Sequence, residues 1–371
     1  MPPVAYPHEL ESYWLNLAQT ETRGVALRDT LQRLRPDIKR LADRFTTARP
    51  ATDTLPDYLR DTRDCAAYAV FFAPQTHARL THILAELPPF PPTPQPLRVL
   101  DLGCGTGAAS FALLDHLGPR PVLLHAHDRS RAALRCLHEC FSTLRASRWP
   151  AAMLRTQAAT LEETAADGPF DVILLHYVLN ELTPALRRSL LARAREWLAP
   201  LGRLIICEPL LREAGDYMRE LRTFALTDLG LHLLAPCPHE QTCPLAEPCH
   251  DVRTWKVPQS LQIVNNLLPR DLRHLAYALL VLSPAPSPAP DGVIRARLVG
   301  SPTFAKGQTL CPACCSNGAI HRLQLLTRDF DTAGRKNLRH LERGQILRLA
   351  SLSLLPDSSL SRARPAPAEE E

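Results

Sequence analysis

Apolar residues recur every three to four positions through the first part of the chain, which is the spacing of amphipathic helices. The spacing is clearest in VALRDTLQRLRPDIKRLADRF (residues 25–45) and HARLTHILAEL (residues 77–87). A proline-rich stretch, PPFPPTPQP (residues 88–96), follows, and this composition is typical of a stiff, extended connector. We therefore predict a helical N-terminal region over residues 1–87.

Continuous apolar runs replace that spacing after the connector. Three of them are LRVLDLG (97–103), PVLLHAHD (121–128) and FDVILLHYVL (170–179), and such runs are typical of parallel strands buried on both faces. GRLIICEP (202–209) predicts a fourth strand, and AAMLRT (151–156) predicts a weaker one between the second and third. Amphipathic segments separate the runs, so the pattern predicts an α/β fold with a doubly wound, Rossmann-like parallel sheet and right-handed crossovers.

The alternation ends after Glu208, and the remaining chain has a different organisation. Residues 211–234 have a helical pattern and precede a loop rich in cysteine. VIRARLVGSP (293–302) and AIHRLQLLTR (319–328) predict strands on either side of CPACCSNG (311–318), a cluster typical of a turn. The predicted regions are 1–87, 88–210 for the sheet, 211–282 for a helical segment that completes the core together with the cysteine loop, 292–350 for a small basic β-rich region and 351–371 for a disordered tail.

A glycine-rich loop, VLDLGCGTGAAS (99–110), leaves the first predicted strand and enters a helix. Glycines there let the backbone pass close beneath a ligand, and Asp101 at the strand end can engage the amino-acid portion of S-adenosylmethionine (SAM). Asp128, at the tip of the next strand, can accept hydrogen bonds from both ribose hydroxyls. The D-x-G-x-G-x-G form matches the first motif of class I SAM-dependent methyltransferases and favours SAM over NAD, the competing cofactor. The glycines are Gly103, Gly105 and Gly107.

Catalytic residues are less clearly marked than the cofactor loop. The segment LLHYVLNEL (174–182) lacks both the N/D-P-P-aromatic signature of amino methyltransferases and the Pro-Cys nucleophile of RNA cytosine-C5 enzymes. Its polar candidates are His176, Asn180 and Glu181. Polar groups at a strand end are more often structural than general bases, so the sequence predicts SAM binding and leaves methyl transfer open.

Eleven cysteines and the absence of an apolar signal segment in MPPVAYPHELESYW (1–14) indicate thiols or metal ligands in preference to disulfides. Cys237, Cys243 and Cys249 are spaced C-x5-C-x5-C in a polar, proline-containing loop, whereas free cysteines favour apolar burial. A fourth ligand would complete either structural zinc or an iron–sulfur cluster, and spacing alone leaves both open. The candidates for this ligand are His239, His250, Cys311, Cys314 and Cys315.

Charge is unevenly distributed along a chain whose formal net charge is +5. Residues 292–350 contain ten Lys and Arg but only three Asp and Glu, so this segment carries +7. A basic surface of this kind suits nucleic acid, and a solvated helix face with excess arginine is the equally weighted alternative.

Several motifs together resemble one family in order and content. They are AYAVFFAP (67–74), LDLGCGTG, VLNEL, CPHEQTCPL (237–245), RHLAYALLVL and RLVGSPTFAKGQ. The chain is similar, from about Tyr58 to Arg328, to the small-ribosomal-subunit assembly methyltransferase-like family, which includes mitochondrial methyltransferase-like seventeen and bacterial relatives.

The resemblance implies a class I methyltransferase fold and association with the small ribosomal subunit during assembly. It also implies a [4Fe–4S] cluster held by Cys237, Cys243, Cys249 and Cys314, the last standing four residues before Gly318. Such a cluster would link the C-terminal β-rich region to the core, although Cys311 and Cys315 leave the fourth ligand ambiguous.

The expected function is therefore that of a SAM-binding, methyltransferase-like factor in small-subunit assembly and translation, with rRNA methylation open. Expected partners are small-subunit rRNA and ribosomal proteins, with no membrane and a monomer away from the ribosome. We expect the protein to be located in the cytoplasm if it is bacterial and in the mitochondrial matrix if it is eukaryotic. The alternatives are a metabolite methyltransferase with structural zinc, or a catalytically inert ribosome assembly protein.

Overall fold

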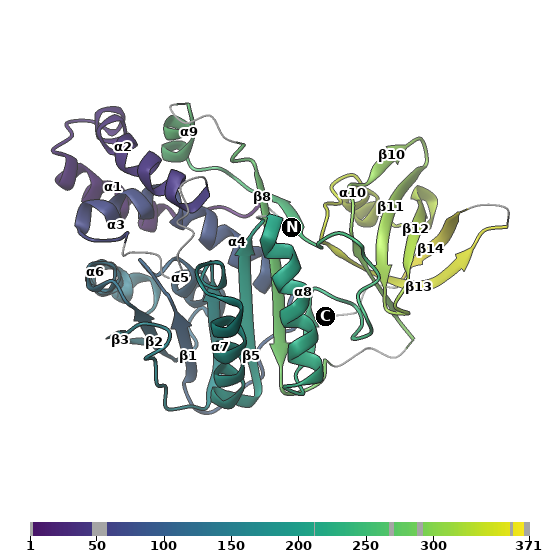
Figure 1. The fold of residues 1–371 in the computed structure, drawn as a ribbon. Coiled ribbons are helices and arrows are strands. Elements are labelled where there is room, and N and C mark those ends of the chain that lie inside the picture. The colour runs from purple at the N-terminus through teal and green to yellow at the C-terminus, as the bar shows by residue number, and fades with distance from the viewer. Residues whose placement is uncertain are drawn as a thin grey trace. The chain divides into compact units, whose positions relative to one another are not determined.

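The computed structural model of the chain describes residues 3–46, 58–210, 212–266, 271–287, 292–356 and 359–366 (Figure 1). It divides into two compact units, each assembled from two segments of the chain. Unit 1 comprises Met1–Glu208 and Thr254–Leu275, and unit 2 comprises Pro209–Arg253 and Ala276–Glu371. The predicted region 211–282 is thus divided between the two units. No helix of the described ranges is both long enough and apolar enough to span a membrane.

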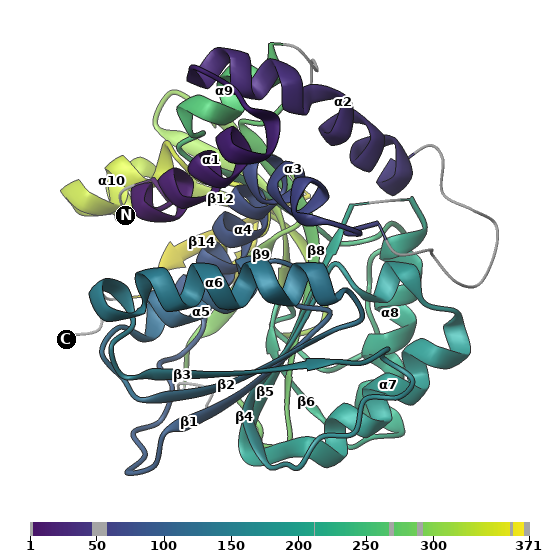
Figure 2. The same cartoon turned by 90° about the vertical axis from the view of Figure 1, so that its left-hand side faces the viewer.

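Unit 1 begins with the helices that the apolar spacing predicts. Helix α3 is capped by Asp61, whose side chain accepts a hydrogen bond from the Asp64 backbone N–H at 2.8 Å, and α4 carries Pro74 in its first turn. Both features are typical helix starts. Figures 1 and 2 show α1, α2, α3 and α9 gathered at one end of unit 1. The helix bounds are α1 (His8–Thr22), α2 (Leu27–Thr46), α3 (Thr62–Phe71), α4 (Ala73–Glu86) and α9 (Gln259–Asn265).

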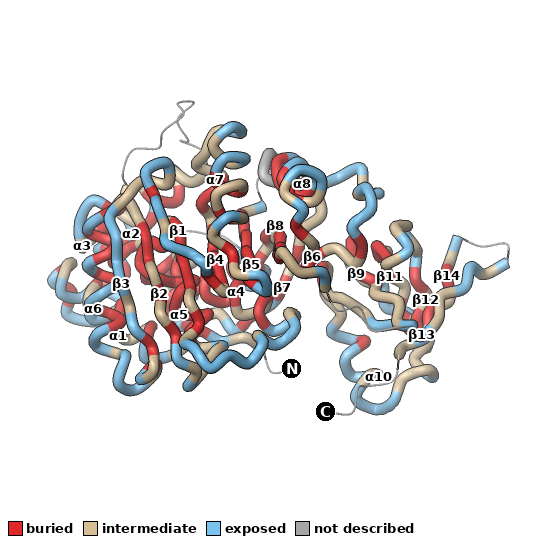
Figure 3. The backbone as a smooth tube through the Cα atoms, turned by 90° about the horizontal axis from the view of Figure 1, so that it is seen from below, coloured by how far each residue is buried: buried red, intermediate tan, exposed pale blue. Residues whose placement is uncertain are grey.

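The sheet of unit 1 runs in the order β3-β2-β1-β4-β5, and every neighbouring pair is parallel. Strands β1 and β4 are almost entirely buried while β3 is mostly exposed at the edge, as the colours of Figure 3 show. The predicted doubly wound sheet is therefore confirmed, including its weak strand. The bounds are β1 (Leu97–Leu102), α5 (Ala108–Leu117), β2 (Val122–Asp128), α6 (Arg131–Arg148), β3 (Ala152–Ala158), β4 (Phe170–His176), η1 (Leu179–Glu181), α7 (Pro184–Trp197) and β5 (Leu198–Pro209).

The strand order places a topological switch between β1 and β4. The chain proceeds from β1 outward through β2 to β3 on one side, and from β4 to β5 on the other. Loops diverge at the carboxyl ends of such a strand pair and leave a crevice where open α/β sheets bind ligands. The glycine loop follows β1, and the candidate catalytic segment begins at the end of β4.

The structure corrects the prediction of a helical segment over residues 211–282. Helix α8 (Arg212–Thr227) is present, but β6 (His232–Ala235) and β8 (His274–Ser283) are antiparallel strands, and β7 (Asp251–Thr254) also pairs with β8. The run HLAYALLVLS in β8 is almost continuously apolar. Periodicity cannot distinguish a strand from a buried helix in so short a run.

The C-terminal part of unit 2 is a small β-barrel. Its strands run in the order β10-β11-β12-β14-β13-β9, and an additional pairing between β9 and β11 closes the ring. Ala296, Leu298, Leu323 and Leu325 are among the buried residues of its core. The bounds are β9 (Ile294–Leu298), β10 (Thr303–Ala305), β11 (Gln308–Cys315), β12 (Ile320–Leu326), η2 (Thr327–Asp329), α10 (Thr332–Leu338), β13 (Ile346–Leu354) and β14 (Leu360–Pro365).

Two predictions for this region are wrong. CPACC belongs to strand β11, and only the residues that follow Cys315 form the turn. The predicted disordered tail at 351–371 instead contains the end of β13 and all of β14, while residues 357–358 and 367–371 lie outside the described residues. Strand β14 buries only the small side chains of Ser361 and Ala363, so it lacks the large apolar residues that mark a strand in sequence.

Candidate functional site

The glycine loop between β1 and α5 has the backbone shape that its sequence requires. Gly103 has φ +70°, and a Cβ there would lie 2.6 Å from the Val178 Cγ2 atom. Gly107, with φ +87°, precedes the first residue of α5. Only glycine adopts this left-handed conformation without steric cost, so both positions need glycine to bring the loop beneath a ligand.

Asp101 is the buried acid at the end of β1. Its Oδ2 atom accepts a 2.6 Å hydrogen bond from the Ser110 hydroxyl, whereas its buried Oδ1 atom has no hydrogen-bond partner among the described residues. Burial raises the pKa of Asp101 to about 7, and the charge of Asp128 adds to the rise. An unpartnered buried acceptor is costly, and a cationic ligand group at Oδ1 would remove that cost.

Asp128, at the tip of β2, holds the glycine loop in place. Its Oδ2 atom accepts from the Gly105 backbone N–H at 2.8 Å, and its Oδ1 atom accepts from the Ser130 backbone N–H at 2.8 Å. A carboxylate offers about four lone-pair sites. Asp128 can therefore keep both backbone contacts while it accepts from ribose hydroxyls, the role predicted from the sequence.

A cavity of about 210 Å³ lies beside the glycine loop. It is smaller than the ~300–1,000 Å³ of typical ligand pockets, so SAM would extend beyond it. Glu181 lines the cavity and is positioned by its neighbours, because the Tyr58 hydroxyl donates to Oε1 at 3.1 Å and Arg129 Nη2 lies 3.5 Å from Oε2. The lining residues are Tyr58, Leu59, Gly103, Asp128, Arg129, Ser130, Ala159, Thr160, Leu161, Glu162, Tyr177, Val178, Glu181 and Leu182.

Of the three catalytic candidates, only Glu181 lines this cavity. His176 is buried, and burial together with the charge of Arg79 lowers its pKa to about 3, so it is neutral near pH 7. Both ring nitrogens of His176 and the Asn180 Oδ1 atom are buried without hydrogen-bond partners among the described residues. The Glu208 carboxylate fixes this segment by accepting from the backbone N–H groups of Val178, Leu179 and Asn180 at 2.9–3.1 Å.

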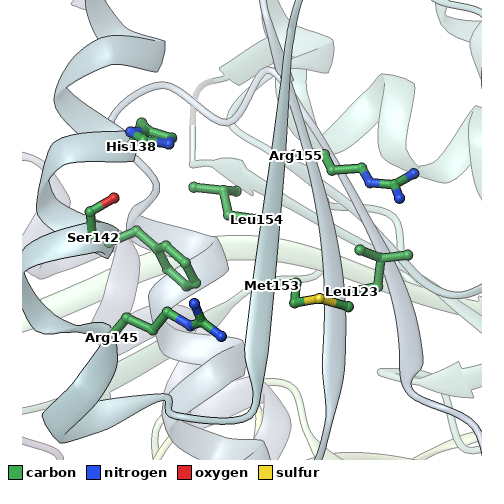
Figure 4. A pocket seen from close by; sticks show the side chains of 8 residues that line it. Leu123, His138, Ser142, Arg145, Met153, Leu154 and Arg155 are labelled. Atoms are coloured by element: carbon green, nitrogen blue, oxygen red, sulfur yellow. The ribbon is translucent and has the colours of Figure 1, made fainter.

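A larger cavity, of about 420 Å³, lies at the β3 edge of the sheet (Figure 4). It is lined by Leu123, His138, Phe141, Ser142, Arg145, Met153, Leu154 and Arg155. None of these residues belongs to the glycine loop or to the segment after β4. Size alone therefore does not mark the cofactor site, and the convergent polar groups at the switch point identify it better.

The cysteine loop of unit 2 converges with one sulfur of the barrel. Burial, together with the charges of Cys237, Cys249 and Cys243, raises the pKa of the Cys314 thiol to about 12. The charges of the loop thiols thus reach Cys314, and the loop contacts it directly through His239. Within the described part of the chain, however, no three His, Cys, Asp or Glu side chains are placed to hold a single metal ion.

Strand alternation separates Cys314 from the other two barrel cysteines. Side chains of β11 point alternately into and out of the barrel, and Cys311 and Cys315 belong to the buried core cluster whereas Cys314 does not. Burial raises the pKa of Cys315 to about 11, and burial and Cys315 raise that of Cys311 to about 12, with no contribution from the loop thiols. Cys314 alone therefore faces the loop.

The two histidine candidates differ in their contacts. His239 Nε2 lies 3.2 Å from the Cys314 Sγ atom, whereas His250 Nδ1 lies 3.3 Å from the backbone oxygen of Pro248 in its own loop. His239 is thus the histidine that borders the four thiols.

Buried arginines surround the same loop. Arg297 Nε donates to the Cys249 sulfur at 3.3 Å, and its Nη2 atom lies 2.5 Å from Asp251 Oδ1. Arg253 Nη2 lies 3.0 Å from Asp251 Oδ2, and Arg222 donates to the backbone oxygen of His239 at 3.1 Å. Cationic side chains of this kind would offset the negative charge of thiolate ligands if the loop held an anionic iron–sulfur centre.

Residues 62–348 match the family described as mitochondrial small ribosomal subunit Rsm22, which is more than half of the chain. The chain belongs to the Rsm22 family. The resemblance seen in the sequence motifs is thereby confirmed.

Other relatives match this Rsm22-family protein over shorter stretches. It is 30% identical over 117 residues to the carboxy-S-adenosyl-L-methionine synthase of Aliivibrio salmonicida, covering 32% of this chain and 46% of the relative. It is 33% identical over 138 residues to that of Stutzerimonas stutzeri, covering 36% and 52%. The chain spans about half the length of these curated relatives.

Solved methyltransferase structures also match this Rsm22-family protein. A SAM-dependent methyltransferase from Leishmania major is 15% identical with a TM-score of 0.39, covering 71% of this chain and 89% of the other. The SAM-bound magnesium protoporphyrin IX methyltransferase of Synechocystis is 15% identical with a TM-score of 0.36, covering 67% and 97%.

Sequence reasoning missed several residues of the two sites. Glu208 lies at the carboxyl end of β5, as Asp128 lies at the carboxyl end of β2. An acid at the end of a further strand was therefore a signal that the sequence contained. Tyr58 and Arg129, which hold Glu181, carry no motif. Arg297 and Arg222 contact the cysteine loop from β9 and α8, and only the fold reveals these contacts.

Proposed function

We propose that this Rsm22-family protein is a SAM-binding, methyltransferase-like factor of small ribosomal subunit assembly and translation. Membership of the Rsm22 family supports the ribosomal role, and the glycine loop with Asp101 and Asp128 supports SAM binding. A [4Fe–4S] cluster on Cys237, Cys243, Cys249 and Cys314 completes the proposal. The observation that carries the cluster is that Cys314, alone among the barrel cysteines, lies outside the barrel core and contacts His239 of the cysteine loop at 3.2 Å.

At the cofactor site, SAM would supply an activated methyl group. The glycine loop would present backbone to the ligand, and the free Oδ1 atom of Asp101 would accept a hydrogen bond from its ammonium group. Glu181, held by Tyr58 and Arg129, also lines the cavity beside the glycine loop and would contact the ligand there. Ribose recognition would fall to Asp128.

Binding of SAM should strengthen as pH rises from 6 to 8. The Asp101 carboxyl has a pKa of about 7 in the folded protein, and a cationic ligand favours its ionised form, by up to about tenfold per pH unit below that pKa. Calorimetric titration with SAM at three pH values measures this. The matched variant Asp101→Asn should bind more weakly and without this pH dependence. An unchanged slope in the variant would contradict the assignment.

In the absence of ligand, the contribution of Asp101 to folding stability falls as pH rises, whereas SAM binding should strengthen as pH rises. Its pKa in the folded state lies above the usual ~3.9 of the unfolded chain, so the folded state binds the proton more tightly. Its stabilising contribution is complete below pH ~4 and is lost as pH rises through about 7.

The cluster would join the cysteine loop to the basic barrel within unit 2. Structural metal sites contribute on the order of 10 kcal/mol to folding in small modules, so cluster loss should disorder both segments together. Cys243→Ser should therefore lower both iron content and cosedimentation with small-subunit particles. Cys140→Ala, a buried cysteine of α6 in unit 1, is the control. Full particle binding by an iron-free Cys243→Ser protein would contradict the joining role.

A catalytically inert assembly protein is the second candidate. It is favoured by the positions of His176 and Asn180 outside the cavity, and by the engagement of Glu181 with Tyr58 and Arg129. Incubation of methyl-labelled SAM with immature small subunits distinguishes the two candidates. Label in rRNA or ribosomal protein supports the enzyme, and SAM binding without transfer supports the inert factor.

A further inference from the structure

The barrel of unit 2 has the topology of an oligonucleotide/oligosaccharide-binding (OB) fold. Its five closing strands, numbered in chain order as β9, β11, β12, β13 and β14, are arranged 1-2-3-5-4-1. The third and fifth of them, β12 and β14, form the one parallel pair among these strands, and α10 lies between the third and fourth. OB folds bind oligonucleotides on the face of the second and third strands.

The outward face of β11 and β12 combines polar side chains and one arginine with apolar residues. Alternation turns Gln308 and Leu310 outward on β11, and the register places Leu326 and Gln324 of β12 opposite them. Gln324 Nε2 donates to Gln308 Oε1 at 2.7 Å. The amide pair lies towards the end of this face that is opposite Cys314, where base edges could contact it.

Arginines continue the face across β12 and β14. Arg322 is exposed on β12, and Arg362 and Arg364 take the outward positions of the adjacent β14. Arg362 is oriented by Asp329, whose Oδ2 atom lies 2.5 Å from its Nη2 atom. Guanidinium groups pair with phosphates and stack on unpaired bases, so this row suits a single-stranded nucleic acid.

The charge of the whole barrel favours the same ligand. Its described residues, 292–356 and 359–366, contain twelve Lys and Arg but only three acids, none of them on β11, β12 or β14. Asp329 pairs with Arg362, and Asp331 caps α10 through the Gly334 backbone N–H at 2.7 Å. Little negative charge therefore opposes phosphate approach to this face.

The cysteine loop borders one end of the face. Cys314 is the last outward residue of β11, opposite Ile320, and His239 of the loop contacts it. A Cβ at Gly318, in the β11–β12 turn, would lie 2.0 Å from the Gln241 side chain of the loop. Gln308 and Gln324 lie towards the opposite end of the β11–β12 pair, away from this contact.

We propose that the outward face of β11, β12 and β14 binds single-stranded RNA. Arg322, Arg362 and Arg364 contact phosphates or stack on bases, and the Gln308–Gln324 pair reads base edges. The choice of RNA over DNA rests on the proposed ribosomal function, whereas single-strand binding rests on topology and charge alone.

Fluorescence anisotropy of the full-length protein with a labelled twelve-nucleotide RNA tests this surface. The double variant Arg322→Ala/Arg364→Ala should weaken binding at least about tenfold and reduce the salt slope by about 1.4, since each phosphate contact on a single strand contributes about 0.7. Arg348→Ala removes a single positive charge from an exposed position on β13 and should change affinity less than about twofold. Melting temperatures check folding.

Several results would overturn the proposal. They are unchanged RNA affinity in the double variant, equal losses in Arg348→Ala, or tighter binding of duplex RNA or of single-stranded DNA of the same sequence. Loss of particle association with unchanged oligonucleotide affinity would assign the face to a protein partner instead. Single-stranded RNA binding by a protein that neither binds SAM nor associates with particles would retain this inference and remove the proposed function.

Discussion

Cys314→Ser should abolish the visible absorbance of an iron–sulfur centre in anaerobically purified protein, and iron should fall from about four atoms per chain to below about one. The physical reason is strand geometry, because Cys314 is the barrel cysteine whose sulfur faces Cys237, Cys243 and Cys249. Serine keeps the size of the side chain but removes the soft sulfur ligand that iron–sulfur clusters require. Absorbance spectra with iron and sulfide assays measure the change.

Cys315→Ala is the matched control for that experiment. Cys315 is adjacent in sequence but lies fully buried in the barrel core, so its loss should leave iron content near the wild-type value while lowering barrel stability. Cluster loss in Cys315→Ala with an intact spectrum in Cys314→Ser would reverse the assignment of the fourth ligand.

Asp251→Asn should destabilise the protein by about 3–5 kcal/mol, because removal of one partner leaves uncompensated buried charge. Asp251 lies between Arg253 and Arg297, and all three side chains are at most 3% exposed. Arg297 also donates to the Cys249 sulfur, so the cysteine loop should loosen as well. Denaturant unfolding of the purified variant measures the loss.

Asp271→Asn is the control for the charge change. The Asp271 side chain is 53% exposed and pairs with His274 and Arg273 at the surface, where ion pairs contribute little because water and salt screen them. Equal destabilisation by the two variants would show that the buried Arg253–Asp251–Arg297 group does not hold the loop.

The sheet and the glycine loop could be predicted because local pattern and tertiary fold agree there. Apolar runs such as LRVLDLG are buried on both faces, and the carboxyl ends of parallel strands bring Asp101 and Asp128 to one edge. In β11, by contrast, Pro312 and the Ser-Asn-Gly sequence that follows Cys315 gave a turn signal. Pro312 lies at the end of the β9 pairing, which begins at Ala313, and its carbonyl oxygen still accepts from the Val299 backbone N–H at 2.9 Å. The strand tolerates the proline because only the backbone N–H donor is missing there.

Local sequence pattern could not identify Cys314 as the fourth cysteine or Arg297 as a contact of the cysteine loop, for a related reason. Once CPACC is recognised as a strand, alternation separates Cys314 from Cys311 and Cys315, but the mistaken turn hid that signal. Arg297 meets Cys249 and Asp251 across about 46–48 positions of sequence, and only the pairing of strands brings them together. Charge counts predicted a basic region but not its closed, OB-like barrel. That closure depends on the pairing of β9 with β11.

The central claim is that the thiols at 237, 243, 249 and 314 hold one inorganic centre. Quantification of iron and acid-labile sulfide per chain in full-length protein purified without oxygen tests it most directly. The account predicts about four of each, whereas stoichiometric zinc without iron, or a metal-free protein of unchanged stability and particle binding, would contradict it.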